Sequence, residues 1–163
     1  MVTTRLFATA FIRNDRRFLM MKRSSQADLL PGIWAPVGGH LEPEEISDPY
    51  SGCLREVAEE TGFTGEDIND LSLRYIVHRI RGDEIRLQYV YFGTSLRSDY
   101  GDTDEGALTW VPYTDVLSLE TSTTTRFVLE RYFAHPHDAD CIHVATVESI
   151  DGKPNMHWTK LSD

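Results

Sequence analysis

The segment Arg-Glu-Val-Ala-Glu-Glu-Thr-Gly at residues 55–62 constrains the fold of this chain more than any other stretch. At about 100° per residue, its arginine and three glutamates fall on one side of a helix, within an arc of about 140°. The opposite side carries mainly apolar residues that can pack against a core. Ser47-Asp48-Pro49 favours a helix start and Gly62 favours a helix end, so we predict a helix from about residue 48 to residue 61.

The acidic side of this helix places like charges close together. Glu56 lies three residues before Glu59 and four before Glu60, and each such pair costs about 0.2–0.5 kcal/mol. Arg55 offsets part of this repulsion, most readily through Glu59 at the i+4 position. A divalent cation would convert the remaining repulsion into binding, because hard cations such as Mg²⁺ prefer oxygen ligands.

Composition limits the possible partners. The chain has 163 residues and a formal charge of −10, which fits one domain and argues against binding to nucleic-acid polymers. No stretch approaches about 18 apolar residues, and the N-terminus lacks the apolar region of a signal peptide, so we expect a cytoplasmic location and no membrane contact. Cys53, on the apolar side of the helix, is expected to be a buried free thiol.

Strands and helices interleave along the chain, and several neighbouring strands can pair as hairpins. This order predicts a mixed β-sheet with helices packed on its faces, in the α+β or α/β class. A second helix is expected from about residue 123 to 134. The expected strands are 5–13, 18–21, 34–37, 71–78, 85–92, 107–111, 142–147 and 156–161.

The residues before the first helix extend its pattern. Gly39 is followed after five residues by Glu45, and the sequence Arg-Glu-Val-Ala-Glu-Glu-Thr-Gly-Phe then completes a motif at residues 39–63 that resembles the Nudix box. Nine residues separate Glu45 from Arg55, where the family pattern has seven. We expect the two extra residues to lengthen the loop at about 46–49, with Glu42 and Glu44 as alternatives to Glu45.

The resemblance implies a single Nudix hydrolase domain over residues 1–163. Its fold would be a mixed sheet sandwiched between helices, with an extra C-terminal β-hairpin in an extension from about 135 to 163. The implied reaction is hydrolysis of a nucleoside diphosphate linked to another group, with Mg²⁺ or Mn²⁺ as the cofactor. The diphosphate resists attack because its charge repels nucleophiles, and metal ions neutralise that charge and acidify bound water.

Roles follow from motif positions. The implied metal ligands are Glu56, Glu59, Glu60, Glu45 and the carbonyl of Gly38. The implied catalytic residues are Glu59 or Glu56 as proton acceptor, Arg55 as the residue that orients the carboxylates, and Glu105 as an acidic residue supplied by a later loop.

Substrate contacts are expected from Gly39 in the box and from residues near it. Arg23, at a strand end, is a candidate phosphate ligand. Trp34 and Trp110 are candidates for stacking on a base, although core packing is the alternative for both. Three arginines near a predicted hairpin turn are open to two interpretations, phosphate binding or solvation; these are Arg79, Arg81 and Arg86.

Missing subfamily signatures leave a small-molecule nucleotide as the substrate, with a MutT-like nucleoside triphosphate pyrophosphohydrolase as the first choice, such as one acting on an oxidised purine nucleotide like 8-oxo-dGTP. A nucleotide sugar or another nucleoside diphosphate derivative is the alternative within the hydrolases. A non-catalytic Nudix nucleotide-binding module is the alternative from another class. Alternating residues in the C-terminal strands favour a face covered by a second copy, so we also expect a homodimer.

Overall fold

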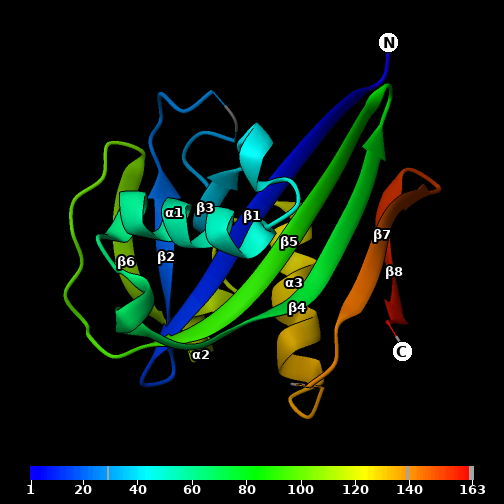
Figure 1. Cartoon of the computed structure of the whole chain (residues 1–163). Coiled ribbons are helices and arrows are strands. Elements are labelled where there is room, and N and C mark those ends of the chain that lie inside the picture. The colour runs from blue at the N-terminus through cyan, green and yellow to red at the C-terminus, as the bar shows by residue number, and fades with distance from the viewer. Residues whose placement is uncertain (29, 139, 162–163) are drawn as a thin grey trace.

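The computed structural model describes residues 1–28, 30–138 and 140–161, and an eight-stranded mixed sheet runs through it (Figure 1). The strand order is β6-β2-β3-β1-β5-β4-β7-β8. β1 pairs parallel with β5, and β4 pairs parallel with β7, whereas the other neighbours are antiparallel. The strands are β1 (Thr3–Asn14), β2 (Arg17–Arg23), β3 (Trp34–His40), β4 (Ile68–Arg81), β5 (Glu84–Ser95), β6 (Gly106–Pro112), β7 (His143–Ile150) and β8 (Lys153–Lys160).

Two helices cover opposite faces of the sheet, as Figure 1 shows with α1 in front and α3 behind. The predicted helices are confirmed as α1 (Pro49–Thr61) and α3 (Thr123–Ala134). Three short helices complete the set: η1 (Pro43–Glu45), η2 (Gly65–Asp67) and α2 (Tyr113–Val116). The mixed sheet between helices therefore has the fold predicted from the sequence.

The alternation of side chains along the central strands divides the core into two layers. On β1, Ala10 and Ile12 face α1 and pack with its buried Val57. Phe11 faces the other way and belongs to an aromatic layer beneath α3. In this layer the Phe92 ring stacks on Phe11 at 4.9 Å between centroids. Beneath α1, the small side chains of Ala8 and Ala10 on β1 allow the helix to approach the sheet closely.

The C-terminal hairpin extends the sheet at one edge. β7 pairs with β4, and β8 forms the edge strand, so the predicted extra hairpin is confirmed. Lys153, Pro154 and Lys160 lie on β8, and such residues discourage pairing with another strand. The homodimer stays a prediction, which light scattering at micromolar concentration can test. Residues 162 and 163 of the predicted extension lie outside the described residues.

Two further expectations concern the chain as a whole. In the part that the structure describes, no helix is both long and apolar enough to cross a bilayer. The cytoplasmic location stays a prediction. Cys53 is buried and free, as expected, and burial raises the pKa of its thiol to about 12.

Truncation of Leu129 tests the packing of α3 on the sheet. Leu129 is fully buried, so Leu129→Ala should lower the free energy of unfolding by about 2–5 kcal/mol through lost burial and a residual cavity. Leu96 is 62% exposed, and Leu96→Ala should change it by less than about 0.5 kcal/mol. Urea denaturation measures both variants. Equal stability of the two would contradict the described packing.

Candidate active site

The position of α1 is fixed at both of its ends. The Asp48 carboxylate accepts a hydrogen bond from the Ser51 amide at 3.3 Å, and Pro49 begins the helix. Gly62 ends it in the left-handed region at φ 75°, with its N–H bonded to the Ala58 carbonyl at 2.9 Å. A left-handed helix end favours glycine because it has no Cβ. The predicted helix boundaries are thus explained by local chemistry.

Two glycines of β3 bring the glutamates of α1 against the sheet. Gly38 has φ 129°, and its amide donates to a carboxylate oxygen of Glu60 at 2.7 Å. A Cβ at Gly38 would lie 2.3 Å from the Ala8 carbonyl oxygen, and one at Gly39 would lie 2.5 Å from a carboxylate oxygen of Glu56. Both positions therefore require glycine for this approach.

Arg55 holds the acidic side of α1 together. Its Nε and Nη2 donate to the two carboxylate oxygens of Glu45 at 2.6 and 2.9 Å. Its Nη1 donates to Glu56 at 2.9 Å and to Glu59 at 3.1 Å, and Nη2 also donates to the His40 carbonyl at 3.1 Å. Hydrogen bonds from Arg55 lower the pKa of Glu45 to about 2. One guanidinium thus offsets part of the negative charge of three carboxylates.

The two extra residues of the box do not displace Glu45. They are absorbed in the turn between η1 and α1, so Glu45 still reaches Arg55 across the start of the helix. Glu42 and Glu44 are exposed and make no side-chain contact with Arg55 among the ion pairs of the described residues. Glu45 therefore occupies the position that its place in the motif predicts.

The remaining carboxylates are buried and crowded. Burial, together with the charges of Glu105 and Glu56, raises the pKa of Glu60 to about 8 against the opposing hydrogen bond from Gly38. Burial also raises the pKa of Glu56, while Arg55 opposes the shift. Glu105 reaches this group from the loop before β6, where its carbonyl accepts a bond from the Ser24 amide at 2.9 Å. We call Glu56, Glu60 and Glu105 the acidic centre. Arg55 offsets part of its negative charge through the bond to Glu56.

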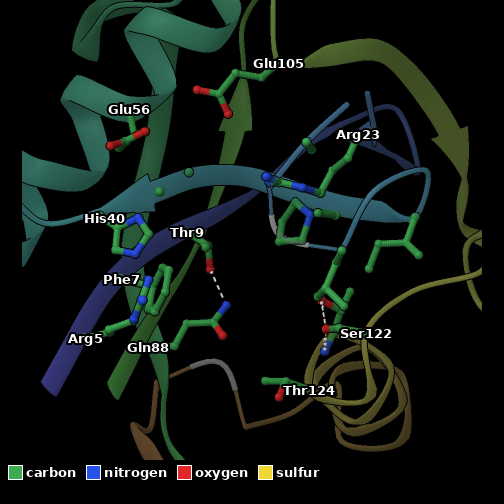
Figure 2. A pocket seen from close by; sticks show the side chains of 18 of the residues that line it. Arg5, Phe7, Thr9, Arg23, His40, Glu56, Gln88, Glu105, Ser122 and Thr124 are labelled. Atoms are coloured by element: carbon green, nitrogen blue, oxygen red, sulfur yellow. Dashed lines mark hydrogen bonds between the residues drawn. The ribbon is translucent and has the colours of Figure 1, made fainter. Parts of the chain in front are cut away.

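A cavity of about 680 Å³ opens beside this acidic centre. In Figure 2, Glu56 and Glu105 lie on one side of the β3 ribbon, and Thr9 and Gln88 lie on the other. Ser122 and Thr124, at the start of α3, line the part of the cavity farthest from Glu105 in this view. The Gln88 amide donates to the Thr9 hydroxyl at 3.0 Å, which leaves its carbonyl oxygen able to accept a bond from a ligand. The volume suits a small organic molecule.

The structure brings together most of the predicted site residues. Glu56, Glu105, Arg23, Gly38 and Gly39 line the cavity. Glu60 lies buried and bonded to Gly38. Glu45 and Glu59 are held by Arg55 outside the lining, and the Glu59 side chain is 60% exposed.

The two tryptophans do not line the cavity. Trp34 packs against the aromatic layer beneath α3, and Trp110 packs against the layer beneath α1. The Trp110 indole N–H donates to the Ser98 carbonyl at 2.7 Å, which ties β6 to the loop that precedes Glu105. The core-packing alternative therefore describes both residues, and Phe7 and His40 are the aromatic side chains that line the cavity instead.

Sequence reasoning missed Arg5 and left Arg79 and Arg86 open, yet all three line the cavity. Arg81 is exposed and does not line it. The alternation of side chains shows which residues of one strand share a face, but it does not relate the faces of different strands. Only the pairing register between distant strands shows that they share a face and a level.

The donor set of the acidic centre suits a hard divalent cation. In residues 1–28, 30–138 and 140–161, no three His, Cys, Asp or Glu side chains form a ready-made metal cluster. Arg55 draws Glu45 and Glu59 to itself, and the other carboxylates repel one another. A cation among Glu56, Glu60 and Glu105 would offset the repulsion that raises the pKa of Glu60, and oxygen ligands favour Mg²⁺ or Mn²⁺.

The family of this chain follows from a comparison with known protein families. The model of the NUDIX domain matches residues 3–152. The chain belongs to the Nudix family. The Nudix box recognised in the sequence therefore lies within a domain match over nearly the whole chain.

Solved structures agree with the Nudix fold. A MutT protein from Bacillus halodurans has a TM-score of 0.70 at 16% identity, covering 94% of this chain and 97% of that one. A MutT protein from Methanosarcina mazei Go1 has a TM-score of 0.70 at 26% identity, covering 83% and 97%. These chains share the mixed sheet and its helices with this protein.

A curated relative matches over a shorter stretch. An m7GpppN-mRNA hydrolase, NUDT17 of Bos taurus, is 41% identical over 50 residues. This match covers 31% of the present chain and 16% of that protein. Membership of the Nudix family supports the enzyme class predicted from the sequence, a Nudix-type pyrophosphohydrolase.

The buried Glu60 predicts an unusual dependence of stability on pH. Its carboxyl keeps a proton in the folded state up to a pKa of about 8, whereas the unfolded chain loses that proton near 4.5. Stability therefore falls as pH rises through this window. Thermal melts in EDTA should show a lower Tm at pH 8 than at pH 5, and Glu60→Gln should reduce the difference.

Glu59→Gln is the matched control for this experiment, because Glu59 lies on the same helix with an exposed side chain. It should keep the pH dependence of the unaltered chain. A Tm difference that survives Glu60→Gln in full would assign the effect to another group.

Proposed function

We propose that this protein hydrolyses the diphosphate linkage of nucleoside diphosphate derivatives with the help of Mg²⁺ or Mn²⁺. The observation that carries the proposal is the acidic centre of Glu56, Glu60 and Glu105 at a cavity that also contains arginines. Acidic side chains suit the metal, and arginines suit the phosphates that it would bring to the site. The combination fits a substrate whose charged group lies between the two.

The metal would be held by Glu56 and Glu60, with Glu59, Glu45 and the Gly38 carbonyl as the further ligands implied by the motif. When bound, it would neutralise diphosphate oxygens and lower the pKa of water. Arg55 orients Glu56 by a hydrogen bond and holds Glu45 and Glu59 beside it. Arg23 lines the cavity and supplies a positive charge for a phosphate.

Proton acceptance from the attacking water is assigned to Glu105. It lines the cavity, whereas Glu59 is turned to Arg55 and Glu56 already accepts a hydrogen bond from that guanidinium. A carboxylate near the reacting water can take its proton as attack proceeds. The loop that carries Glu105 is anchored by the Trp110–Ser98 bond and by the Gly101 amide, which donates to the Thr61 carbonyl at 2.7 Å.

The first substrates to test are nucleoside triphosphates, including 8-oxo-dGTP, and then nucleotide sugars. The names of similar proteins give different substrates, such as those of an m7GpppN-mRNA hydrolase and of an Ap4A hydrolase from C. elegans. Neither Trp34 nor Trp110 lines the cavity, so the proposal covers the broad class of nucleoside diphosphate derivatives and assigns no tryptophan to stacking on an oxidised purine.

Replacing the assigned proton acceptor tests the mechanism. Glu105→Gln should lower kcat by about 10²–10⁴-fold, since a carboxamide cannot accept the proton. Glu44→Gln removes an exposed carboxylate of the same box and should keep the activity of the unaltered chain. Formation of the nucleoside monophosphate, measured by chromatography with Mg²⁺ over the substrate panel, gives both rates. Full turnover by Glu105→Gln would move the base to another residue.

Removal of the metal tests the cofactor. EDTA should abolish hydrolysis, because no divalent cation then neutralises the charge of the diphosphate. Added Mg²⁺ or Mn²⁺ should restore the activity. Nucleotide binding without turnover, under all of these conditions, would favour the non-catalytic binding module. A Nudix domain of NrtR from Shewanella oneidensis, with a TM-score of 0.64 at 17% identity, has been crystallised with ADP ribose.

A further inference from the structure

Three arginines lie side by side in one row across three adjacent strands. Arg5 of β1 is the register partner of Arg86 of β5, and Arg86 is the partner of Arg79 of β4. Neighbouring strands lie about 4.8 Å apart, so the row is about 10 Å wide. All three side chains line the cavity, and Figure 2 shows Arg5 beside Phe7 and His40 at its wall. We call Arg5, Arg79 and Arg86 the arginine row.

The arginine row is costly without an anion. Like charges directly opposite on neighbouring strands repel each other. Glu84 pairs with Arg5 at 2.9 Å and also with Arg86, but no ion pair or side-chain hydrogen bond of Arg79 occurs among the described residues. Burial lowers the pKa of Arg79, and the charges of Arg81 and Arg86 lower it further. One carboxylate therefore pairs with two of the three guanidinium groups and leaves the third without an ion pair among the described residues.

The positive field of the row reaches into the cavity. The pKa of His40 is lowered, first by burial and then by the charges of Arg5, Arg86 and Arg23. The His40 ring lies 4.2 Å from the Phe7 ring, and the Arg86 guanidinium carbon lies 6.0 Å from the same ring. On this wall of the cavity, one guanidinium of the row and the His40 ring both pack against Phe7, so the wall favours an anionic group over a stacked base.

The arginine row is well separated from the acidic centre. Gly38, which binds Glu60, is the register partner of Thr9, and Arg5 lies four residues from Thr9 along β1. At about 3.3 Å per residue, the two levels are about 13 Å apart. Phe7 and Gln88 occupy the level between Thr9 and Arg5. A diphosphate held at the acidic centre would not itself reach the row, but a nucleoside attached to it could span the gap.

We propose that the arginine row binds a phosphomonoester at the far end of the substrate, so that the preferred substrates are diphosphates whose nucleoside carries a 2′- or 3′-phosphate. This inference rests on the proposed diphosphate hydrolysis. A phosphomonoester carries nearly two negative charges and three acceptor oxygens, which match several guanidinium groups arranged side by side. The remaining cavity wall, with Gln88 and Thr9, would contact the nucleoside between the two charged ends.

Matched substrate pairs test the proposal through turnover. NADPH and NADH differ by a single 2′-phosphate, and coenzyme A and its dephospho form differ by a 3′-phosphate. The unaltered chain should have a higher kcat/KM for the phosphorylated member of at least one pair. Arg79→Gln should reduce that ratio about tenfold, as expected for the loss of a charge-assisted hydrogen bond.

Arg81→Gln is the matched control. Arg81 lies two residues along β4 from Arg79, is exposed, and does not line the cavity. This variant should keep the ratio of the unaltered chain and report any general effect of lost charge. Equal kcat/KM for both members of each pair, or a ratio unchanged by Arg79→Gln, would overturn the role of the arginine row while leaving diphosphate hydrolysis intact.

A binding measurement separates this inference from the proposed hydrolysis. Calorimetry on the unaltered chain, without turnover, should show tighter binding of adenosine 2′,5′-bisphosphate or adenosine 3′,5′-bisphosphate than of 5′-AMP. Arg79→Gln should remove this preference and Arg81→Gln should retain it. If this preference is observed but no substrate is hydrolysed, phosphomonoester binding by the arginine row is confirmed and the proposed hydrolysis is contradicted. No preference, or no binding of any of the three nucleotides, would overturn the row.

Discussion

The charge balance around Arg55 underlies the rest of the site. A single guanidinium bonds to Glu45, Glu56 and Glu59 and also to the His40 carbonyl at the end of β3. It therefore connects the loop before α1, the exposed side of α1 and the glycine-containing strand. Without this cation, the acidic side of the helix would carry its repulsion unrelieved, and the Gly38–Glu60 hydrogen bond would have to hold α1 to β3 without the bond from Arg55 to the His40 carbonyl. The fold and the chemistry thus depend on the same contact.

Much of this arrangement could be predicted from local sequence. The faces of α1 follow from helical periodicity, and its ends follow from Asp48, Pro49 and Gly62. The residues of the acidic centre on α1 could be named because their motif is contiguous. The sequence also predicted the extra hairpin, although β7 and β8 extend further than the patterns indicated.

The parts that escaped prediction depend on long-range pairing. Trp34 and Trp110 had the right residue type for a base platform, but strand register turned both into the core layers. The arginine row depends on strands β1, β4 and β5, and Arg5 and Arg86 are far apart in the sequence. A shift of one residue in either pairing would move an arginine to the other face of the sheet. Such placements are properties of the assembled sheet and not of any short segment.

The two glycines of β3 have a consequence for how this protein can diverge. They are the point at which carboxylates from the α1 side of the sheet reach a cavity whose walls come from the other face. The acidic centre and the arginine row therefore lie on separate elements that meet at these two glycines. Mutations in β1, β4 and β5 can change what is recognised without disturbing α1, so one reaction centre can be inherited unchanged by descendants with different substrates.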